Sequence, residues 1–484
     1  MGKRALRGAR APREALDMSV LVGHGIHVAW GWLMFTGSLF AGPRGDLIHA
    51  PLLPDALYTL SLGANVVVLA AFALWGRSLV PLFKREGVAV AAAVLMAAGT
   101  FSASRFVPLL LGSPTALVEV LAGLMTGAGA GVFLLLWGEV LLSFGVRGCL
   151  LYFAASSFLA ALAHIAAGLV PVEAVQALVS LAPVVELALY RTAVGRRGLA
   201  LARSNRTAEV PAPLPRNVVA LGVFFGISFG AMRGFFFHVD EAGLADARHV
   251  VSMLFVMAAC VLVYVVSVRR GTDFGRLTYQ IALPLVALGF LLLPLSQGWS
   301  LAATAAYRIG FQYMYVILWG LWVYCARRDG TASLWLIACG LLSLQLSKLV
   351  GFVASADAIT VLGAAFDPSV FTSVFLFATV VFALFAKENH IAEGGWEGVR
   401  PAAEASDEAS FAEQRYEGAA AAFSLSPRET EVFYLLLRGR SRAHIAKELV
   451  VTEETVKSHI KAIYQKAGVH TKQDLIDRVE ALAG

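Results

Sequence analysis

Apolar residues occur in twelve long stretches along the first 390 residues of the chain. A helix needs roughly 20 apolar residues to cross the hydrocarbon core of a bilayer, which is about 30 Å thick. Each stretch meets or approaches that length, and polar segments separate them. The pattern therefore predicts a polytopic membrane bundle of about twelve helices, at residues 17–40, 56–75, 87–104, 115–142, 149–170, 173–190, 217–237, 249–267, 277–295, 300–324, 331–355 and 369–386.

The longest polar segment between these stretches runs from Arg191 to Arg216 and divides them into two sets of six. A 6+6 arrangement with a long central loop resembles the layout of major facilitator superfamily transporters. The resemblance covers residues 1–390 and implies a transporter-like fold. That family usually has a Gly-Asp-Arg-Gly-Arg-type loop after its second span. Here the loop reads GRSLVPLFKREG, without the Asp, whereas the matching loop of the second half, RRGTDFGRL, is nearer.

Basic residues are distributed unevenly between the two sides of the predicted bundle. The loops on one side contain 20 Lys and Arg residues, whereas those on the other contain only Arg44, Arg105 and Arg248. Since cytoplasmic loops carry the excess of positive charge, the N-terminus is predicted to be cytoplasmic, and an even number of spans places the C-terminus there too. The apolar stretch from Ser19 to Phe40 is too long for a signal peptide and has no A-x-A site, so it is predicted to remain as the first span. The expected location is the inner or plasma membrane.

The composition agrees with a membrane protein and excludes an ordinary soluble one. Hydrophobic residues make up 58% of the chain, charged residues 15%, and the mean hydropathy is +0.71. A soluble protein has about 25% charged and 45–50% apolar residues. The net charge of +6 fits either DNA binding or basic loops. The cysteines lack metal-ligand spacing and are predicted to pack as small apolar residues: Cys149, Cys260, Cys325 and Cys339.

The composition changes abruptly after Lys387. Residues 388–423 contain eight acidic residues and two Arg, and they are rich in Ala and Glu. This pattern predicts a cytoplasmic linker, with a helical turn or two near Glu408–Ala421. If flexible, these 36 residues span roughly 30–35 Å, which keeps the following domain close to the membrane. The predicted organisation is a transmembrane sensor domain at 1–390, a linker at 391–423 and a DNA-binding domain at 424–484.

Residues 424–484 have the pattern of four short helices, each with a start or stop signal. The first opens with a capping box and Pro427 at its first position, and it is expected to stop at Gly439, where a left-handed cap has little strain. The third is expected to run from Glu453 to about Ala467. The short step through Val450-Val451-Thr452 between the second and third helices is typical of a helix-turn-helix. The capping residues are, in chain order, Ser426 with Glu429, Ser441, Thr452, and Thr471 with Asp474.

The third of these helices has two chemically distinct faces. Val456, Ile460 and Ile463 recur at helical spacing and are predicted to face the domain core. Lys457 and Lys461 share another face, with Ser458 and Gln465 alongside. A recognition helix needs this division, because one stripe packs on the scaffold while the other meets base edges and phosphates in the major groove of double-stranded DNA. The alternative is that these lysines belong to an ordinary solvated face.

The sequence LSPRETEVFYLLLRGRSRAHIAKELVVTEETVKSHIKAIYQKAGV resembles the LuxR-type helix-turn-helix of LuxR/NarL/FixJ regulators over about 60 residues. The resemblance implies base contacts by Lys457, Ser458 and Lys461, and backbone contacts or helix-start packing at Thr452, Thr455 and His459. It also implies dimerisation through the fourth helix. The sequence departs from the family at Ala467, where a larger apolar residue is usual. The matching positions are Leu425, Arg428, Glu429, Glu431, Val432, Gly439, Ser441, Ile445, Ala446, Leu449, Thr455, Val456, Lys457, His459, Ile463, Lys466 and Val469.

The net charge of this domain is about +2, from ten Lys and Arg and eight Asp and Glu. So weak a charge predicts few phosphate contacts per monomer, and therefore a homodimer on paired half-sites of a promoter.

Ionisable side chains inside membrane spans are costly, and each is by default a candidate for function. The span containing Arg308 and Gln312 is also rich in aromatic residues, which could hold a small aromatic or carboxylated ligand, although interfacial aromatics explain them equally well. Arg308 or Lys348 could instead pair with a Glu across the bundle. The candidate ligand-sensing residues are Glu119, Glu139, Arg233, Arg308, Gln312 and Lys348, and Glu186, His24, His27, His164 and Gln345 add polarity.

The sequence contains no nucleophile elbow, phosphate-binding Gly loop or zinc motif, so it predicts no enzyme, no cofactor and no metal. We expect a one-component regulator that lies in the lipid bilayer, senses an unknown small molecule through its membrane bundle and binds promoter DNA. One alternative is a transporter of a small molecule with a regulatory cytoplasmic domain. Another is a regulator that responds to a partner membrane protein. The ligand, the operator and the sign of regulation do not follow from the sequence.

Overall fold

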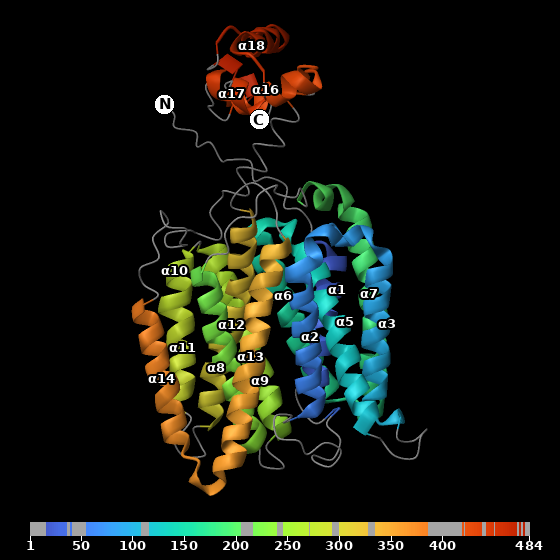
Figure 1. The fold of residues 1–484 in the computed structure, drawn as a ribbon, viewed down its shortest axis with the longest axis vertical. Coiled ribbons are helices and arrows are strands. Elements are labelled where there is room, and N and C mark those ends of the chain that lie inside the picture. Colours follow the sequence, from blue (N-terminus) through green and yellow to red (C-terminus); the bar gives the residue numbers. More distant parts are fainter. Residues whose placement is uncertain are drawn as a thin grey trace, which may run out of the picture. The chain divides into compact units, whose positions relative to one another are not determined.

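The computed structural model describes residues 16–35, 39–40, 55–107, 116–204, 216–239, 245–270, 272–292, 300–327, 334–385, 419–420, 422–437, 442–449, 451–471, 474–475 and 478–479. Every regular element in these ranges is a helix (Figure 1). The described residues fall into two compact units, one within Met1–Ala402 and the other within Ala403–Gly484. Each unit has its own hydrophobic core. The expected all-α fold class is confirmed.

The first unit is a bundle of long apolar helices. Ten helical segments in the described ranges are long and apolar enough to cross a membrane, and two shorter apolar helices accompany them. This agrees with the expectation of about twelve spans. The helices are α1 (Met18–Phe35), α2 (Ala56–Trp75), α3 (Glu86–Ser102), α5 (Ala116–Leu142), α6 (Gly145–Ala167), α7 (Val172–Ser204), α8 (Arg216–Val239), α9 (Ala245–Val263), α11 (Leu283–Leu292), α12 (Ser300–Arg327), α13 (Leu334–Leu362) and α14 (Pro368–Phe385).

Short helical segments connect several of these helices. Two 3-10 turns, η1 (Gly76–Leu79) and η2 (Leu82–Lys84), lie between α2 and α3. The π-helical segment η3 (Tyr264–Arg269) continues α9. The short α10 (Phe274–Arg276) and the π-helical η4 (Leu277–Ala282) lead into α11. A further 3-10 turn, η6 (Gly363–Ala365), follows α13.

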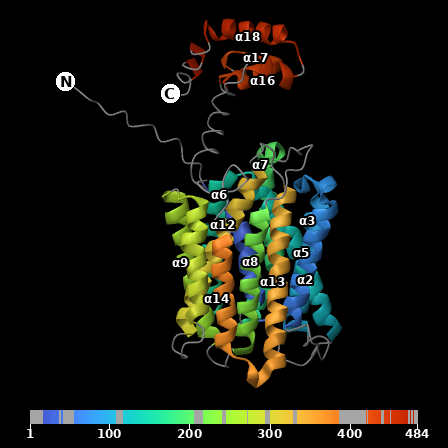
Figure 2. The ribbon, with the colours of Figure 1, turned by 60° about the vertical axis from the view of Figure 1, so that its left-hand side comes forward.

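The packing of the two six-helix sets follows one repeated scheme. In the first set α1 packs on α6, α2 and α3 both pack on α5, and α3 packs on α7. The second set repeats this with α8 on α13, α9 and α11 on α12, and α11 on α14. The sets meet through α2 against α13 and α6 against α9, so the interface follows the same symmetry (Figures 1 and 2). The bundle therefore consists of two matching halves.

Glycines allow α8 and α13 to approach with their backbones nearly in contact. Gly222, Gly226, Gly230 and Gly234 recur every fourth residue, so they lie along one face of α8. A Cβ atom on Gly230 would overlap the backbone around Lys348, and one on Gly226 would overlap the Ser347 hydroxyl. Small residues of this kind drive helix association in a bilayer, where apolar surface gains little from being buried between helices.

Side chains also bridge the two halves at the end of the bundle where α5 finishes and α13 begins. Arg327 donates a hydrogen bond of 2.8 Å to the carbonyl oxygen of Leu142. The indole of Trp335 donates another, also 2.8 Å, to the carbonyl oxygen of Ala73. These bonds use carbonyls near helix ends, where intrahelical donors run out.

Some span boundaries differ from the expected ones. Helix α7 continues to Ser204, well into the segment that the sequence pattern assigned to the central loop. The extension is TAVGRRGLALARS, in which Ala, Leu and Arg are strong helix formers, so the helix persists after the apolar stretch has ended. Helix α6 begins at Gly145, four residues before the expected start. Within the described ranges no disulfide joins the four cysteines, and three of them are buried.

The second unit contains α16 (Pro427–Leu437), α17 (Arg442–Glu448) and α18 (Glu453–Ala467), followed by short described helical pieces at 474–475 and 478–479. Its core includes Val432, Ile445, Val456, Ile463 and Leu475. Ala419, Ala420 and Phe423 also pack in this core, which therefore begins before residue 424. The expected stop at Gly439, the cap at Ser441 and most of the expected turn near Glu408–Ala421 lie outside the described residues.

Candidate functional site

The first candidate site is the exposed face of α18. Thr452 caps this helix, since its hydroxyl accepts from the backbone N–H of Thr455 at 3.2 Å, and Gly468 ends it with φ of 67°. Val456, Ile463 and Ala467 are buried on the side that faces the core. The small Ala467, where the resemblance implied a larger residue, is thus a fully packed core position.

The opposite side of α18 is polar and open. Six of the seven expected DNA-binding residues are exposed: Thr452, Thr455, Lys457, Ser458, Lys461 and Gln465. His459 is half-buried at the edge of this face. Lys457 forms an ion pair of 3.0 Å with Glu454 one turn earlier, but both side chains are more than half exposed. Such exposed pairs are weak, so a phosphate group could replace the carboxylate as the partner of Lys457.

Two contacts fix α18 and α17 on α16. Lys466 donates to Glu429 at 2.6 Å and to the carbonyl oxygen of Ser424 at 3.2 Å. Glu429 also accepts from the backbone N–H of Ser426 at 2.7 Å, which completes the expected capping box. Arg428 donates to the carbonyl oxygen of Leu449, near the end of α17, at 2.7 Å.

The expected cap of the fourth helix is present as well. The Asp474 carboxylate accepts from the backbone N–H of Thr471, and the Thr471 hydroxyl accepts from the backbone N–H of Asp474.

The second candidate site lies between the two halves of the bundle and is centred on Arg233 of α8. Its guanidinium donates to the carbonyl oxygen of Phe35 at 2.8 Å and to the Oδ2 atom of Asp55 at 3.2 Å. It also lies over the ring of Tyr58, with the central carbon 3.7 Å from the ring centroid. Phe35, Asp55 and Tyr58 all belong to the first half, so Arg233 joins the halves at the end of the bundle where α8 finishes.

Arg308 and Lys348 lie in the same neighbourhood. The positive charge of Arg233 acts on both of them through space. The Lys348 ammonium is 5.7 Å from the ring centroid of Phe229, and that ring is 3.9 Å from the ring of Phe311. Both cations are half-buried. Among the described residues neither Arg308 nor Lys348 forms an ion pair with a Glu, whereas Arg233 and Asp55 form one between the halves.

The remaining sensing candidates divide between the two ends of the bundle. Gln312, one turn from Arg308 on α12, is buried, and its Nε2 atom has no hydrogen-bond partner. Glu119, in the first turn of α5, is half-buried and within electrostatic reach of Asp55. Glu139 does not join this group. It is fully buried at the other end of α5, where it accepts from the backbone N–H groups of Leu82 and Phe83 at 3.0 and 2.8 Å.

A separate polar cluster lies inside the first half. The carboxylate of Glu186 accepts from the indole of Trp137 at 2.8 Å, and the Nδ1 atom of His27 is 3.0 Å from the same oxygen. Glu186 is fully buried, and its second oxygen has no hydrogen-bond partner. His24 packs nearby against the rings of Trp137 and Phe153.

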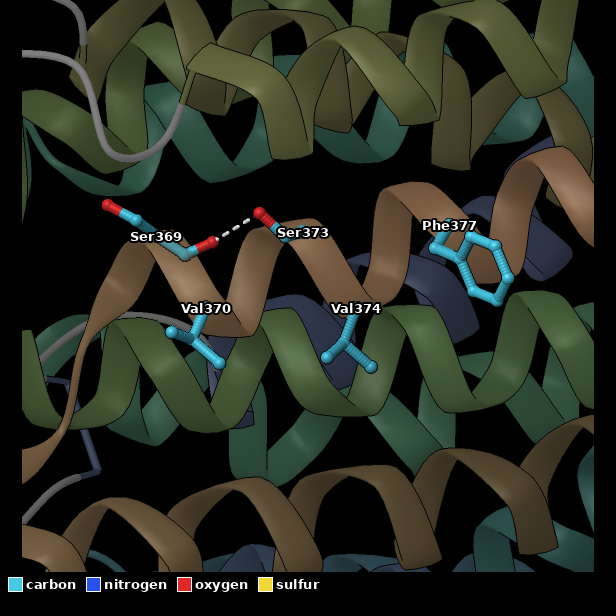
Figure 3. A pocket seen from close by; sticks show the side chains of 5 residues that line it. All are labelled: Ser369, Val370, Ser373, Val374 and Phe377. Carbon is cyan, nitrogen blue, oxygen red and sulfur yellow. Dashed lines mark hydrogen bonds between the residues drawn. The ribbon is translucent and has the colours of Figure 1, made fainter.

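A surface hollow among the described residues has no such chemistry. It lies on α14 and is lined by Ser369, Val370, Ser373, Val374 and Phe377 (Figure 3). The Ser373 hydroxyl donates to the carbonyl oxygen of Ser369 at 2.7 Å, and the valine and phenylalanine side chains are exposed. An exposed apolar face of this kind is expected on a helix that contacts lipid.

Asp55 and Tyr58 were not among the expected site residues. Asp55 precedes the second apolar stretch, and an acid at such a position is ordinarily explained by capping alone. It does cap α2, since its Oδ1 atom accepts from the backbone N–H of Tyr58 at 3.2 Å. Its second oxygen is what reaches Arg233. The sequence signal for Asp55 is an acidic residue directly before a span, in a bundle whose other spans contain Arg and Lys residues that need a negative partner.

Comparison with known proteins finds similarities for both units. Residues 423–479 match the family model described as bacterial regulatory proteins, luxR family. The bundle is similar in fold to the human organic anion transporter MFSD10, with 13% identity and a TM-score of 0.52, over 78% of this chain and 100% of that one. It is also similar to a bacterial homologue of the iron transporter ferroportin in an outward-facing state, with 14% identity and a TM-score of 0.53, over 79% of this chain and 100% of that one. At such identities the likeness shows the fold alone.

Proposed function

We propose that this chain, a LuxR-type helix-turn-helix domain joined to a membrane bundle with the major facilitator superfamily fold, is a membrane-bound one-component transcriptional regulator. The bundle binds a small molecule and thereby controls sequence-specific binding of promoter DNA by residues 424–484. The observation that carries the proposal is the division of α18 into a buried apolar face and an exposed polar face with Lys457 and Lys461. In this geometry the lysines and Ser458 contact bases and phosphates in the major groove.

The remaining expected residues complete the interface. Thr452 and Thr455 are at the exposed start of α18, where hydroxyls and backbone N–H groups suit a phosphate. Gln465 extends the polar face towards the other end of the helix, and His459 borders it. The domain charge of about +2 favours a homodimer, because two copies double the number of phosphate contacts.

The topology follows from the same proposal. A DNA-binding domain must lie in the cytoplasm, and the loop charges place both termini there in a multi-pass inner or plasma membrane protein. Ligand binding can change DNA binding only if the ligand has different affinities for two conformations of the bundle. We expect contacts between the halves, such as that of Arg233 with Asp55, to differ between two such conformations.

The test is a comparison of transcript profiles in cells that express the full chain or its Lys457→Ala, Lys461→Ala variant at equal levels. We expect the variant to lose the regulated transcripts. The matched control is Arg269→Ala with Arg270→Ala, which also removes two exposed positive charges but outside the DNA-binding domain. Identical profiles for the wild type and the α18 variant would overturn the proposal.

The fold likeness to transporters also supports a second candidate, a transporter with a regulatory domain. This candidate requires uptake of a solute into proteoliposomes by the full chain. Uptake that persists unchanged in the Lys457→Ala, Lys461→Ala variant, together with unaltered transcripts, would favour the transporter over the regulator.

A further inference from the structure

Three cations of the second half lie near one another, namely Arg233 on α8, Arg308 on α12 and Lys348 on α13, and Arg233 contacts the first half. The charge of Arg233 acts on both of the others. Like charges held this close inside a bundle repel one another, and each is also costly to remove from water. The arrangement therefore needs compensating negative charge.

The described residues supply only part of that charge. Asp55 forms an ion pair with Arg233, whereas Arg308 and Lys348 have no ion pair and no hydrogen bond in the part of the chain that the structure describes. Glu119 is within reach of the Asp55 charge but forms no ion pair with the cations among the described residues. Positive charge thus exceeds paired negative charge at this position.

Several polar groups near these cations that lack hydrogen-bond partners are donors or can donate. Besides the two free cations, the Nε2 atom of buried Gln312, the Nε atom of Arg233 and the hydroxyl of Tyr58 have no hydrogen-bond partner. Guanidinium and ammonium groups have no acceptor atoms at all. A molecule that satisfies this set must therefore bring acceptor oxygens and negative charge.

Aromatic rings surround the same cations. Tyr58 lies under the Arg233 guanidinium, with the ring of Phe352 5.0 Å from that of Tyr58. Phe229, beside Lys348, packs on Phe311, and Tyr307 bonds the carbonyl oxygen of Phe229 at 3.3 Å. These rings provide apolar and planar surface for the body of a ligand whose charged group contacts the cations.

We propose that Arg233, Arg308, Lys348 and Gln312 form the binding site of a small organic anion, a carboxylate on an aromatic body. This inference rests on the proposed function, since it names the ligand class of the sensing bundle. The ligand carboxylate competes with Asp55 for Arg233. Binding therefore replaces a bond between the halves with a bond to the ligand, which changes the equilibrium between conformations of the bundle.

Two variants distinguish competition between the ligand and Asp55 from a purely structural role of the ion pair. If Arg233 and Asp55 only held the halves together, Asp55→Asn and Arg233→Met would break the same bond and change ligand binding in the same direction. In the proposed site the two variants act in opposite directions. Asn also caps helices well and tolerates the left-handed conformation of residue 55, which has φ of 47°, so Asp55→Asn keeps the start of α2 intact.

The experiment measures binding of benzoate and 3-phenylpropionate to the full chain in lipid nanodiscs by tryptophan fluorescence. Benzamide and 3-phenylpropanamide, which have the same rings without the charge, serve as matched neutral probes. We expect the carboxylates to bind at least about tenfold more tightly than the amides, since a charge-assisted hydrogen bond would be lost. Equal binding of both probe classes, or none by either up to their solubility limits, would overturn the proposal.

The variants then locate the site. We expect Arg308→Gln, Lys348→Met and Arg233→Met each to weaken carboxylate binding about tenfold or more, Arg308→Lys to retain most of it, and Asp55→Asn to strengthen it. Arg105→Met, an exposed cation at the same end of the bundle, should leave the affinity unchanged. Gel filtration and thermal unfolding identify any variant that fails to fold. Weakening by both Asp55→Asn and Arg233→Met would overturn the competition.

A transcript comparison on the same variants separates this inference from the proposed function. Carboxylate binding without any change in the regulated transcripts would support the site and contradict ligand control of DNA binding. Ligand-dependent transcripts that persist in Arg308→Gln and Lys348→Met would support the regulator and overturn this site.

Discussion

Lys466, near the end of α18, and Glu429, in the first turn of α16, form a hydrogen-bonded ion pair of 2.6 Å that is mostly buried on the Glu429 side. Bonds from Lys466 and from the backbone of Ser426 lower the pKa of Glu429 to about 2. The carboxylate therefore caps the start of α16 and also holds α18 through its bond with Lys466.

This pair predicts acid sensitivity of the DNA-binding unit. Because the pKa of Glu429 is lower in the folded state than in the unfolded state, its contribution, roughly 1–2 kcal/mol for a partly solvated charged hydrogen bond, is present at neutral pH and is lost as the pH falls from about 4.5 towards 2. Residues 403–484 have their own core, so the fragment can be unfolded with urea and followed by circular dichroism. Glu429→Gln should remove most of this pH dependence. The exposed Glu431→Gln is the control and should change stability by less than about 1 kcal/mol.

The contact between α8 and α13 predicts strong intolerance of a single methyl group. We expect Gly230→Ala to lower the thermal stability of the full chain by the equivalent of about 1–3 kcal/mol, because a Cβ there overlaps the backbone around Lys348. Gly63→Ala in α2 is the matched control, since nothing lies within 4 Å of its Cβ position. That change should be neutral or should stabilise the helix by up to about 1 kcal/mol. Equal behaviour of both variants would contradict the close approach.

Glu139 has a structural role that a charge-neutral variant can test. A Gln at this position offers one acceptor oxygen where two backbone N–H groups are bound, and its amide donor faces the second N–H. We expect Glu139→Gln to destabilise the bundle by about 1–3 kcal/mol and to increase protease cleavage between α2 and α3. Glu86→Gln, in an exposed pair with Arg191, should have almost no effect. An unaltered melting temperature for Glu139→Gln would show that the loop is held by other contacts.

The salt dependence of DNA binding distinguishes two possible contacts of Lys461 on α18, one with a phosphate and one with a base. Each phosphate contact adds about 0.9 to the slope of log affinity against log salt concentration. If Lys461 contacts a phosphate, Lys461→Ala should lower that slope by about 1 for each monomer bound. If it contacts a base, the slope should be preserved while binding to altered operators becomes less selective. Retardation of labelled promoter fragments at several salt concentrations measures both quantities.

The DNA-binding unit could be predicted in detail because its signals are local. Caps such as Thr452, the helical spacing of Val456 and Ile463, and the polar stripe with Lys457 all lie within one or two turns of each other. The bundle could be predicted only as a set of spans. Its site depends on pairs such as Asp55 with Arg233, which are 178 residues apart, and nothing local indicates which cation an acid will meet.

The length of α7 could not be predicted for another reason. Apolar length determines where a span leaves the hydrocarbon, but the helix ends where the backbone loses helical preference. In α7 these two positions differ, since Ala- and Arg-rich residues continue the helix to Ser204.

The close approach of α8 and α13 makes these two helices one packed unit within the second half of the bundle. Arg233 and Lys348 lie on two helices of the same half whose backbones are in close contact, so we expect them to move together when the halves tilt. Asp55 caps α2 and Tyr58 lies in its first turn, and α2 belongs to the opposite half. If the halves tilt relative to each other, the distance that changes is therefore the one between the cations of the second half and Asp55 of the first half.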